Sequence, residues 1–93
     1  MFAITFDMII ADLKRYYGEP YNNAYFDIST VLFRFGFYRI QGSVYLSESV
    51  DMVNLVRAIE ALKQIEWFKQ SVRDIRTFRV ENWSDFTEFV KDL

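Results

Sequence analysis

The chain contains no cysteine and no histidine. Without cysteine it forms no disulfide, offers no thiol nucleophile and binds no zinc through thiolates. Without histidine it has no Ser-His-Asp triad, no imidazole metal ligand and no histidine general base. Catalytic chemistry must therefore come from carboxylates, hydroxyls, lysine, arginine, backbone amides or a hard metal ion held by carboxylates.

Other absences narrow the class of protein. Neither GxGxxG nor GxxxxGK[ST] occurs, which argues against a dinucleotide-binding fold and against a P-loop. No apolar run is long enough to span a membrane, and the N-terminus lacks the features of a signal peptide. We therefore expect a cytoplasmic protein with no membrane partner. The net charge of −2 argues against a broadly basic nucleic-acid-binding surface but leaves room for a local basic patch.

Apolar and aromatic residues are abundant. The chain has 93 residues, of which 52% are hydrophobic and 19% are aromatic. This length predicts a single domain, residues 1–93. The aromatic content is high for a small domain, and surplus apolar surface is often buried between subunits. We therefore predict a homodimer.

The spacing of apolar residues predicts the secondary structure. Alternation predicts strands at Phe2–Asp7, Phe37–Gln41, Ser43–Ser47 and Ser71–Glu81. Spacings of three and four predict core helices at Pro20–Phe35 and Asp51–Ile65, a helical turn at Ile9–Tyr17 and a short helix at Asp85–Val90 capped by Ser84. Gly36 is expected to end the first core helix in the left-handed conformation, and Gly42 to close a hairpin.

This order of elements favours an α+β fold, the ferredoxin-like βαββαβ sandwich. In it a four-stranded antiparallel sheet carries two helices on one face. We expect Phe2, Ile4 and Phe6 to face the helices. The uncovered face is then predicted to carry Ala3, Thr5, Asp7, Phe37, Arg39 and Tyr45. Phe26 and Phe33 lie off the apolar stripe of their helix, as extra core or as part of an interface.

Asp7 is the residue that the pattern marks for chemistry. It lies near the carboxyl end of the first strand, where open α/β sheets tend to bind ligands. The alternative is that Asp7 merely begins the next turn. A two-fold axis near this strand would bring two copies of Asp7 together, and a pair of carboxylates is the least that a divalent ion such as Mg²⁺ needs in a ligand-poor site.

The last strand carries a cluster of cations, Arg73, Arg76 and Arg79. A spacing of three does not place them on one face of a strand, and they could simply protect an edge strand against pairing. The alternation of apolar residues slips near Asp74, which predicts a β-bulge there.

The chain resembles virulence-associated protein D, a bacterial family, in MFAITFD, FGFYRIQGSVY and IEWFKQSVRDIRTFRVENWSDFTEF. The resemblance implies a ferredoxin-like homodimer similar to the small CRISPR-associated adaptation nuclease. It also implies endoribonuclease activity and, in some bacteria, the role of toxin in a toxin–antitoxin pair with a small antitoxin protein. The implied site residues are Asp7, Ser43 and Asp74, with Leu13 as a supporting residue.

Phosphodiester cleavage requires an activated nucleophile and compensation of the charge on the phosphate. In a metal route, Asp7 of each subunit holds a divalent ion, while Ser43 contacts the phosphate and Asp74 orients either the water or the ribose 2′-hydroxyl. In a metal-free route, a carboxylate acts as base on the ribose 2′-hydroxyl. The side chains expected to bind RNA are Arg39, Arg73 and Arg76. The alternatives to an RNA-cleaving enzyme are a non-catalytic dimeric adaptor that binds RNA or protein and a small-molecule sensor.

Overall fold

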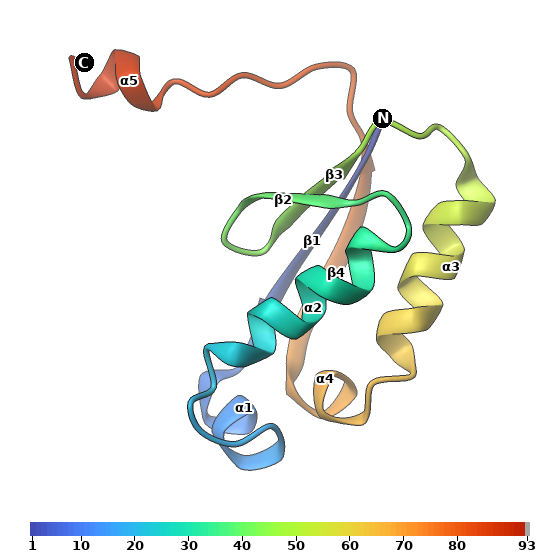
Figure 1. Ribbon diagram of the computed structural model, residues 1–93, viewed down its shortest axis with the longest axis vertical. Helices are drawn as coiled ribbons and strands as arrows, with labels where there is room; N and C mark the ends of the chain where they lie inside the picture. Colours follow the sequence, from blue (N-terminus) through green and yellow to red (C-terminus); the bar gives the residue numbers. More distant parts are fainter. Residues whose placement is uncertain (93) are drawn as a thin grey trace.

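The computed structural model describes residues 1–92. Figure 1 shows its elements, β1 (Phe2–Met8), α1 (Ile10–Tyr16), α2 (Asn23–Phe33), β2 (Tyr38–Gln41), β3 (Val44–Ser47), α3 (Met52–Lys63), α4 (Glu66–Ser71), β4 (Val72–Arg79) and α5 (Thr87–Val90). The sheet order is β2-β3-β1-β4, and all neighbouring strands are antiparallel. The ferredoxin-like α+β fold is therefore confirmed. None of the helices in residues 1–92 is long and apolar enough to cross a membrane.

The hydrophobic core lies between the sheet and helices α2 and α3. From β1, Phe2, Ile4 and Phe6 are buried in it, which confirms the predicted register of this strand. The helices contribute Ala24, Ile28 and Leu32 from α2, and Leu55, Ala58 and Leu62 from α3. Because β1 presents its large side chains to these helices, its polar residues Thr5 and Asp7 are left on the opposite face.

The β2–β3 hairpin faces the other way from the prediction. Phe37 and Tyr45, expected on the uncovered face, are 1% and 0% exposed. Tyr45 pairs with Ile4 and stacks on Phe6 with ring centroids 5.9 Å apart. Its hydroxyl shares a 2.8 Å hydrogen bond with the Ser29 hydroxyl of α2, so its polar end is satisfied inside the core. Since side chains alternate along a strand, an error of one residue in register reverses the whole face.

The core helices are shorter than predicted, and α4 was not predicted at all. α2 begins at Asn23 and not at Pro20, although Gly36 has the expected left-handed conformation with φ 79°. The N-cap of α3 is Asp51, whose side chain accepts a 2.9 Å hydrogen bond from the Val53 amide. α4 fills the connection from α3 to β4 and buries Phe68 in the core.

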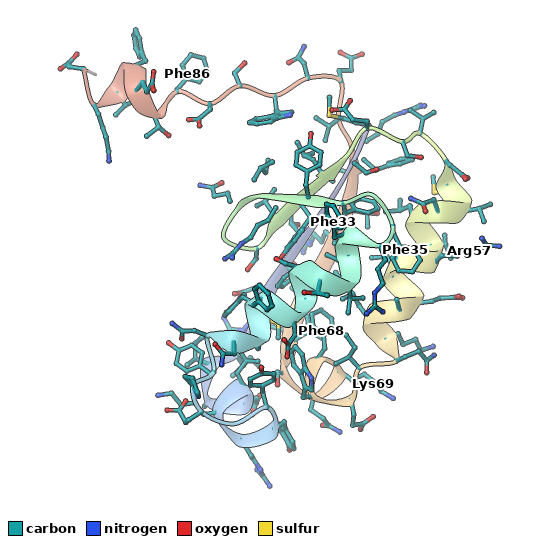
Figure 2. All side chains as sticks on the ribbon, in the orientation of Figure 1. Phe33, Phe35, Arg57, Phe68, Lys69 and Phe86 are labelled. Carbon is teal, nitrogen blue, oxygen red and sulfur yellow. The ribbon has the colours of Figure 1, made fainter. Side chains whose placement is uncertain are left out.

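Residues 80–92, here called the C-terminal arm, leave the body of the domain beyond β4 and end at α5 (Figure 1). The predicted short helix is present as Thr87–Val90. Ser84 does not cap it, and Asp85 instead accepts a 2.8 Å hydrogen bond from the Thr87 amide. Figure 2 shows Phe86 on this arm, away from the sheet and the core helices.

Candidate functional site

Two carboxylates face each other across β1 and β4 at one end of the sheet. Asp7 pairs directly with Asp74 in the antiparallel register. The register then shifts, because Met8 pairs with Val72 and leaves Arg73 as an extra residue in β4. The β-bulge predicted near Asp74 is thus confirmed. Like charges directly opposite each other destabilise a sheet, so cations or a ligand must compensate this pair.

An arginine accompanies each of the two carboxylates. Arg73 Nη1 lies 3.5 Å from Asp7 Oδ2, and Arg76 Nε lies 3.0 Å from Asp74 Oδ2. The bulge interrupts the alternation of β4, so Arg73 and Arg76 gather at the carboxylates in spite of their spacing of three. Arg79 pairs opposite Phe2, at the other end of the strand, and does not belong to the site.

These four side chains are largely exposed, with relative exposures of 61% for Asp7, 50% for Asp74, 62% for Arg73 and 68% for Arg76. Exposed ion pairs of this kind contribute only about 0–1 kcal/mol to stability. An arriving phosphate can therefore draw the guanidinium groups away from the carboxylates at little cost. Because guanidinium groups bind phosphate bidentately, the site can hold an anionic backbone beside two free carboxylates.

The β2–β3 turn lies beside the same end of β1. The Phe6 amide donates a 3.2 Å hydrogen bond to the Ser43 carbonyl, so Ser43 lies next to the residue that precedes Asp7. Arg39 reaches this turn through a 2.7 Å hydrogen bond from Nε to the Gly42 carbonyl. The prediction of Arg39 on the uncovered face is wrong, because Arg39 pairs with a core residue of β3 and therefore lies on the helix-covered side.

Leu13 is fully buried in α1, with 0% exposure. Its carbonyl accepts hydrogen bonds from the amides of Tyr17 and Gly18, at 2.9 and 3.1 Å. A side chain in this position cannot contact a substrate. The predicted supporting role of Leu13 can therefore only be indirect, through packing of the segment that follows β1.

Tyr25 is a feature of the site that the sequence reasoning missed. It lies on the apolar stripe of the helix predicted at Pro20–Phe35, and its ring packs against core residues while remaining partly exposed. Burial raises the pKa of the Tyr25 hydroxyl, and repulsion from Tyr21 and Asp7 raises it further, whereas the positive charge of Arg39 lowers it. The hydroxyl thus lies within electrostatic reach of both Asp7 and Arg39. Nothing in the spacing of α2 distinguishes such a position from an ordinary core residue.

One chain offers two clustered carboxylates for a hard metal ion at this end of the sheet, those of Asp7 and Asp74. Within residues 1–92, no three acidic side chains gather closely enough to hold a metal. Ca²⁺ takes about six to eight oxygen ligands, which this pair does not supply, whereas Mg²⁺ keeps several waters and is usually held by one or two carboxylates. The pair therefore fits Mg²⁺ only if Arg73 and Arg76 release the carboxylates. A site shared by Asp7 of two copies stays a prediction.

Comparison with known proteins gives a consistent result over the length of the chain. The family model described as CRISPR associated protein Cas2 matches residues 1–88. The chain is 62% identical to Endoribonuclease VapD 1 of Riemerella anatipestifer, over 90% of this chain and 94% of that protein. It is 57% identical to Endoribonuclease VapD of Dichelobacter nodosus, over 98% of both chains. It is 50% identical to Endoribonuclease VapD of Haemophilus influenzae, over 99% of this chain and 100% of that protein.

Proposed function

The chain belongs to the protein family of Cas2 and endoribonuclease VapD, and we propose that it is itself an endoribonuclease that cleaves single-stranded RNA such as mRNA. The structural observation that carries this proposal is the Asp7–Asp74 pair, flanked by Arg73 and Arg76 on an exposed end of the sheet. It combines phosphate-binding cations with carboxylates able to move a proton, in a chain that has no histidine. Such a substrate would place the protein in the cytoplasm.

In the mechanism that the residues of one chain can support, the nucleophile is the ribose 2′-hydroxyl. Asp7 acts as the base, with Asp74 beside it, and removes the 2′-hydroxyl proton. The 2′-oxygen forms a bond to phosphorus, the bond from phosphorus to the 5′-oxygen breaks, and the 5′-oxygen takes a proton from solvent. Arg73 and Arg76 donate hydrogen bonds to the non-bridging oxygens and offset the charge that accumulates there.

Ser43 is the third residue of the proposed site. Its carbonyl accepts a hydrogen bond from the Phe6 amide, which places the residue beside the end of β1, and its hydroxyl is proposed to donate to a phosphate oxygen. The alternative route needs a divalent ion shared by Asp7 of two copies, which would polarise the phosphate and activate a bound water. The two routes leave different products, because attack by the 2′-hydroxyl gives a 2′,3′-cyclic phosphate and attack by water in the metal route gives a 5′-phosphate.

The test is incubation of the purified full chain with end-labelled RNA, with and without chelator. Internal cleavage that resists chelator and leaves a cyclic phosphate supports the route through the 2′-hydroxyl. Cleavage that stops in chelator and leaves a 5′-phosphate supports the shared metal. RNA that is bound but stays intact under both conditions contradicts the enzyme and favours the non-catalytic adaptor.

We further propose that the protein acts as a homodimer. The C-terminal arm exposes Phe86, Phe89 and Val90 by 65%, 80% and 75%, and the edge strand β4 exposes Phe78 by 49%. Apolar side chains of this size are typically covered by a partner. Analytical ultracentrifugation should give a molecular mass of twice the 11.2 kDa of one chain. A monomer at micromolar concentration would contradict this proposal and would also remove the shared metal site.

A third proposal concerns the role of the cleavage in the cell. We propose that the protein is the toxin of a toxin–antitoxin pair and that a small antitoxin protein is its partner. Uncontrolled cleavage of mRNA halts protein synthesis, so induced expression of the wild-type chain should stop bacterial growth. Asp7→Asn should not stop growth at the same protein level. Equal growth arrest by both chains would show that toxicity does not come from cleavage at Asp7.

A further inference from the structure

A cavity of about 460 Å³ lies between the start of α1, the first half of α2 and the edge strand β2. It is lined by Ile10, Tyr21, Asn22, Tyr25, Phe26, Ser29 and Arg39. Its volume falls within the range of about 300–1,000 Å³ found for small-ligand pockets. We call it the tyrosine pocket.

The tyrosine pocket combines stacking surfaces with the polar side chain of Asn22, whereas Ser29 and Arg39 already hydrogen-bond the Tyr45 hydroxyl and the Gly42 carbonyl. Tyr21, Tyr25 and Phe26 offer three aromatic rings, and the Phe26 ring is 72% exposed. Asn22 is the N-cap of α2 but makes no capping hydrogen bond with its side chain, which leaves its amide free to pair with a ligand. Aromatic rings for stacking and an amide for hydrogen bonding are what proteins use to bind an unpaired base.

The pocket is connected to the proposed reaction centre at two points. Arg39, in its wall, donates from Nε to the Gly42 carbonyl in the turn that also contains Ser43. This bond ties the guanidinium to the turn, which itself lies beside the end of β1 through the hydrogen bond from the Phe6 amide to the Ser43 carbonyl. Ile10, a second wall residue, is the first residue of α1 and follows Asp7 by three residues along the chain. Asp7 lies on the uncovered face of the sheet and the pocket on the helix-covered side, so a nucleotide chain that occupies both must pass around the end of β1, where Ile10 lines the pocket.

We propose that the tyrosine pocket binds one unpaired RNA base adjacent to the cleaved phosphate and so determines the sequence preference of cleavage. This inference rests on the proposed endoribonuclease function. The base stacks on Phe26 and the tyrosine rings, and the Asn22 amide pairs with its hydrogen-bonding edge. Arg39 contacts the phosphate between that base and the reaction centre.

The chain provides a closely matched control for Phe26. Phe33 lies on the same helix, two turns further along, and is 73% exposed against 72% for Phe26, but it does not line the pocket. Phe33 is the last residue of α2, far from the first half of the helix that lines the pocket (Figure 2). Because both rings are exposed, Phe26→Ala and Phe33→Ala should fold equally well.

The experiment measures cleavage of RNA oligonucleotides that differ only in the base next to the cleavage site, including one oligonucleotide with an abasic nucleotide there. Phe26→Ala should raise KM about 5- to 150-fold for the preferred base, which is the range for loss of one stacked base. On the abasic substrate the same variant should match the wild type. Asn22→Ala should change which base is preferred, and Phe33→Ala should behave as the wild type throughout.

The outcomes separate this inference from the proposed function. If the wild type cleaves no RNA, the proposed function is wrong and the inference falls with it. If the wild type cleaves RNA but Phe26→Ala and Asn22→Ala keep its KM and base preference, the function stands and the tyrosine pocket does not bind a base. The inference is also overturned if Phe26→Ala loses as much activity on the abasic substrate as on the intact one.

Discussion

Leu13→Ala tests whether a residue implied to support the site acts only through packing. Leu13 is fully buried, and replacing such a side chain by alanine lowers the free energy of unfolding by about 2–5 kcal/mol. A domain of 93 residues has a free energy of unfolding of about 5–14 kcal/mol. The substitution should therefore remove a large part of the stability and lower Tm by roughly 8–40 °C. Thermal unfolding followed by circular dichroism measures this loss.

The decisive readout is the cleavage rate of the fraction that remains folded, measured well below the lowered Tm. If Leu13 acts through packing, folded Leu13→Ala should cleave RNA within a few-fold of the wild-type rate. Leu13→Met, which preserves volume, should cost less than about 1.5 kcal/mol and keep full activity. A folded Leu13→Ala variant that has lost nearly all activity would refute this reasoning and would give Leu13 a direct role in the site.

Three further predictions concern the neighbourhood of the site. Asp74→Asn removes the like-charge repulsion with Asp7, so Tm should stay the same or rise while the cleavage rate falls at least tenfold. A lower Tm with an unchanged cleavage rate would contradict the proposed role of Asp74 in cleavage. Ser71 is buried, and its hydroxyl has no hydrogen-bond partner among residues 1–92. Ser71→Ala should therefore raise the free energy of unfolding by up to about 1 kcal/mol in a denaturant titration. A clear fall in this free energy would show that the hydroxyl makes a stabilising hydrogen bond. The pKa of Tyr25, followed by NMR, should fall in Asp7→Asn and rise in Arg39→Gln, and no change in either variant would separate Tyr25 from the site. Because this pKa is raised on folding, its contribution to stability is present below the ordinary value of 10.0 and should be lost as pH rises through the folded-state value.

The parts of the fold that the sequence predicts correctly are those where the two faces of an element differ clearly. In β1, the large residues Phe2, Ile4 and Phe6 alternate with small or charged ones, so only one register is compatible with a buried core. The hairpin has apolar residues on both faces, and Leu46 is 2% exposed even though it alternates with the core residue Tyr45. Arg39 and Gln41 make one side of β2 the more polar one, but β2 is an edge strand, so this side faces the helices and still reaches solvent.

The candidate site likewise has one part that the sequence predicted and another that it could not. The slip in alternation near Asp74 is a local signal, and it predicted the bulge. The contact between Arg73 and Asp7 depends on the pairing register of two strands far apart in the sequence, which no local pattern contains. Tyr25 has ordinary core spacing on α2, and only the position of β2 beside the helix turns it into the wall of a cavity.

The central claim is that Asp7 acts in RNA cleavage, and the single-turnover cleavage rate of Asp7→Asn tests it most directly. The substitution keeps the shape of the side chain and removes its charge. Glu60→Gln, at an exposed position of α3, is the control for loss of one negative charge. We predict a fall of about 10²- to 10⁴-fold for Asp7→Asn, with unchanged Tm and association state, and a wild-type rate for Glu60→Gln. Cleavage by Asp7→Asn at the wild-type rate would contradict the account and leave Asp7 as a residue of β1 without a catalytic role.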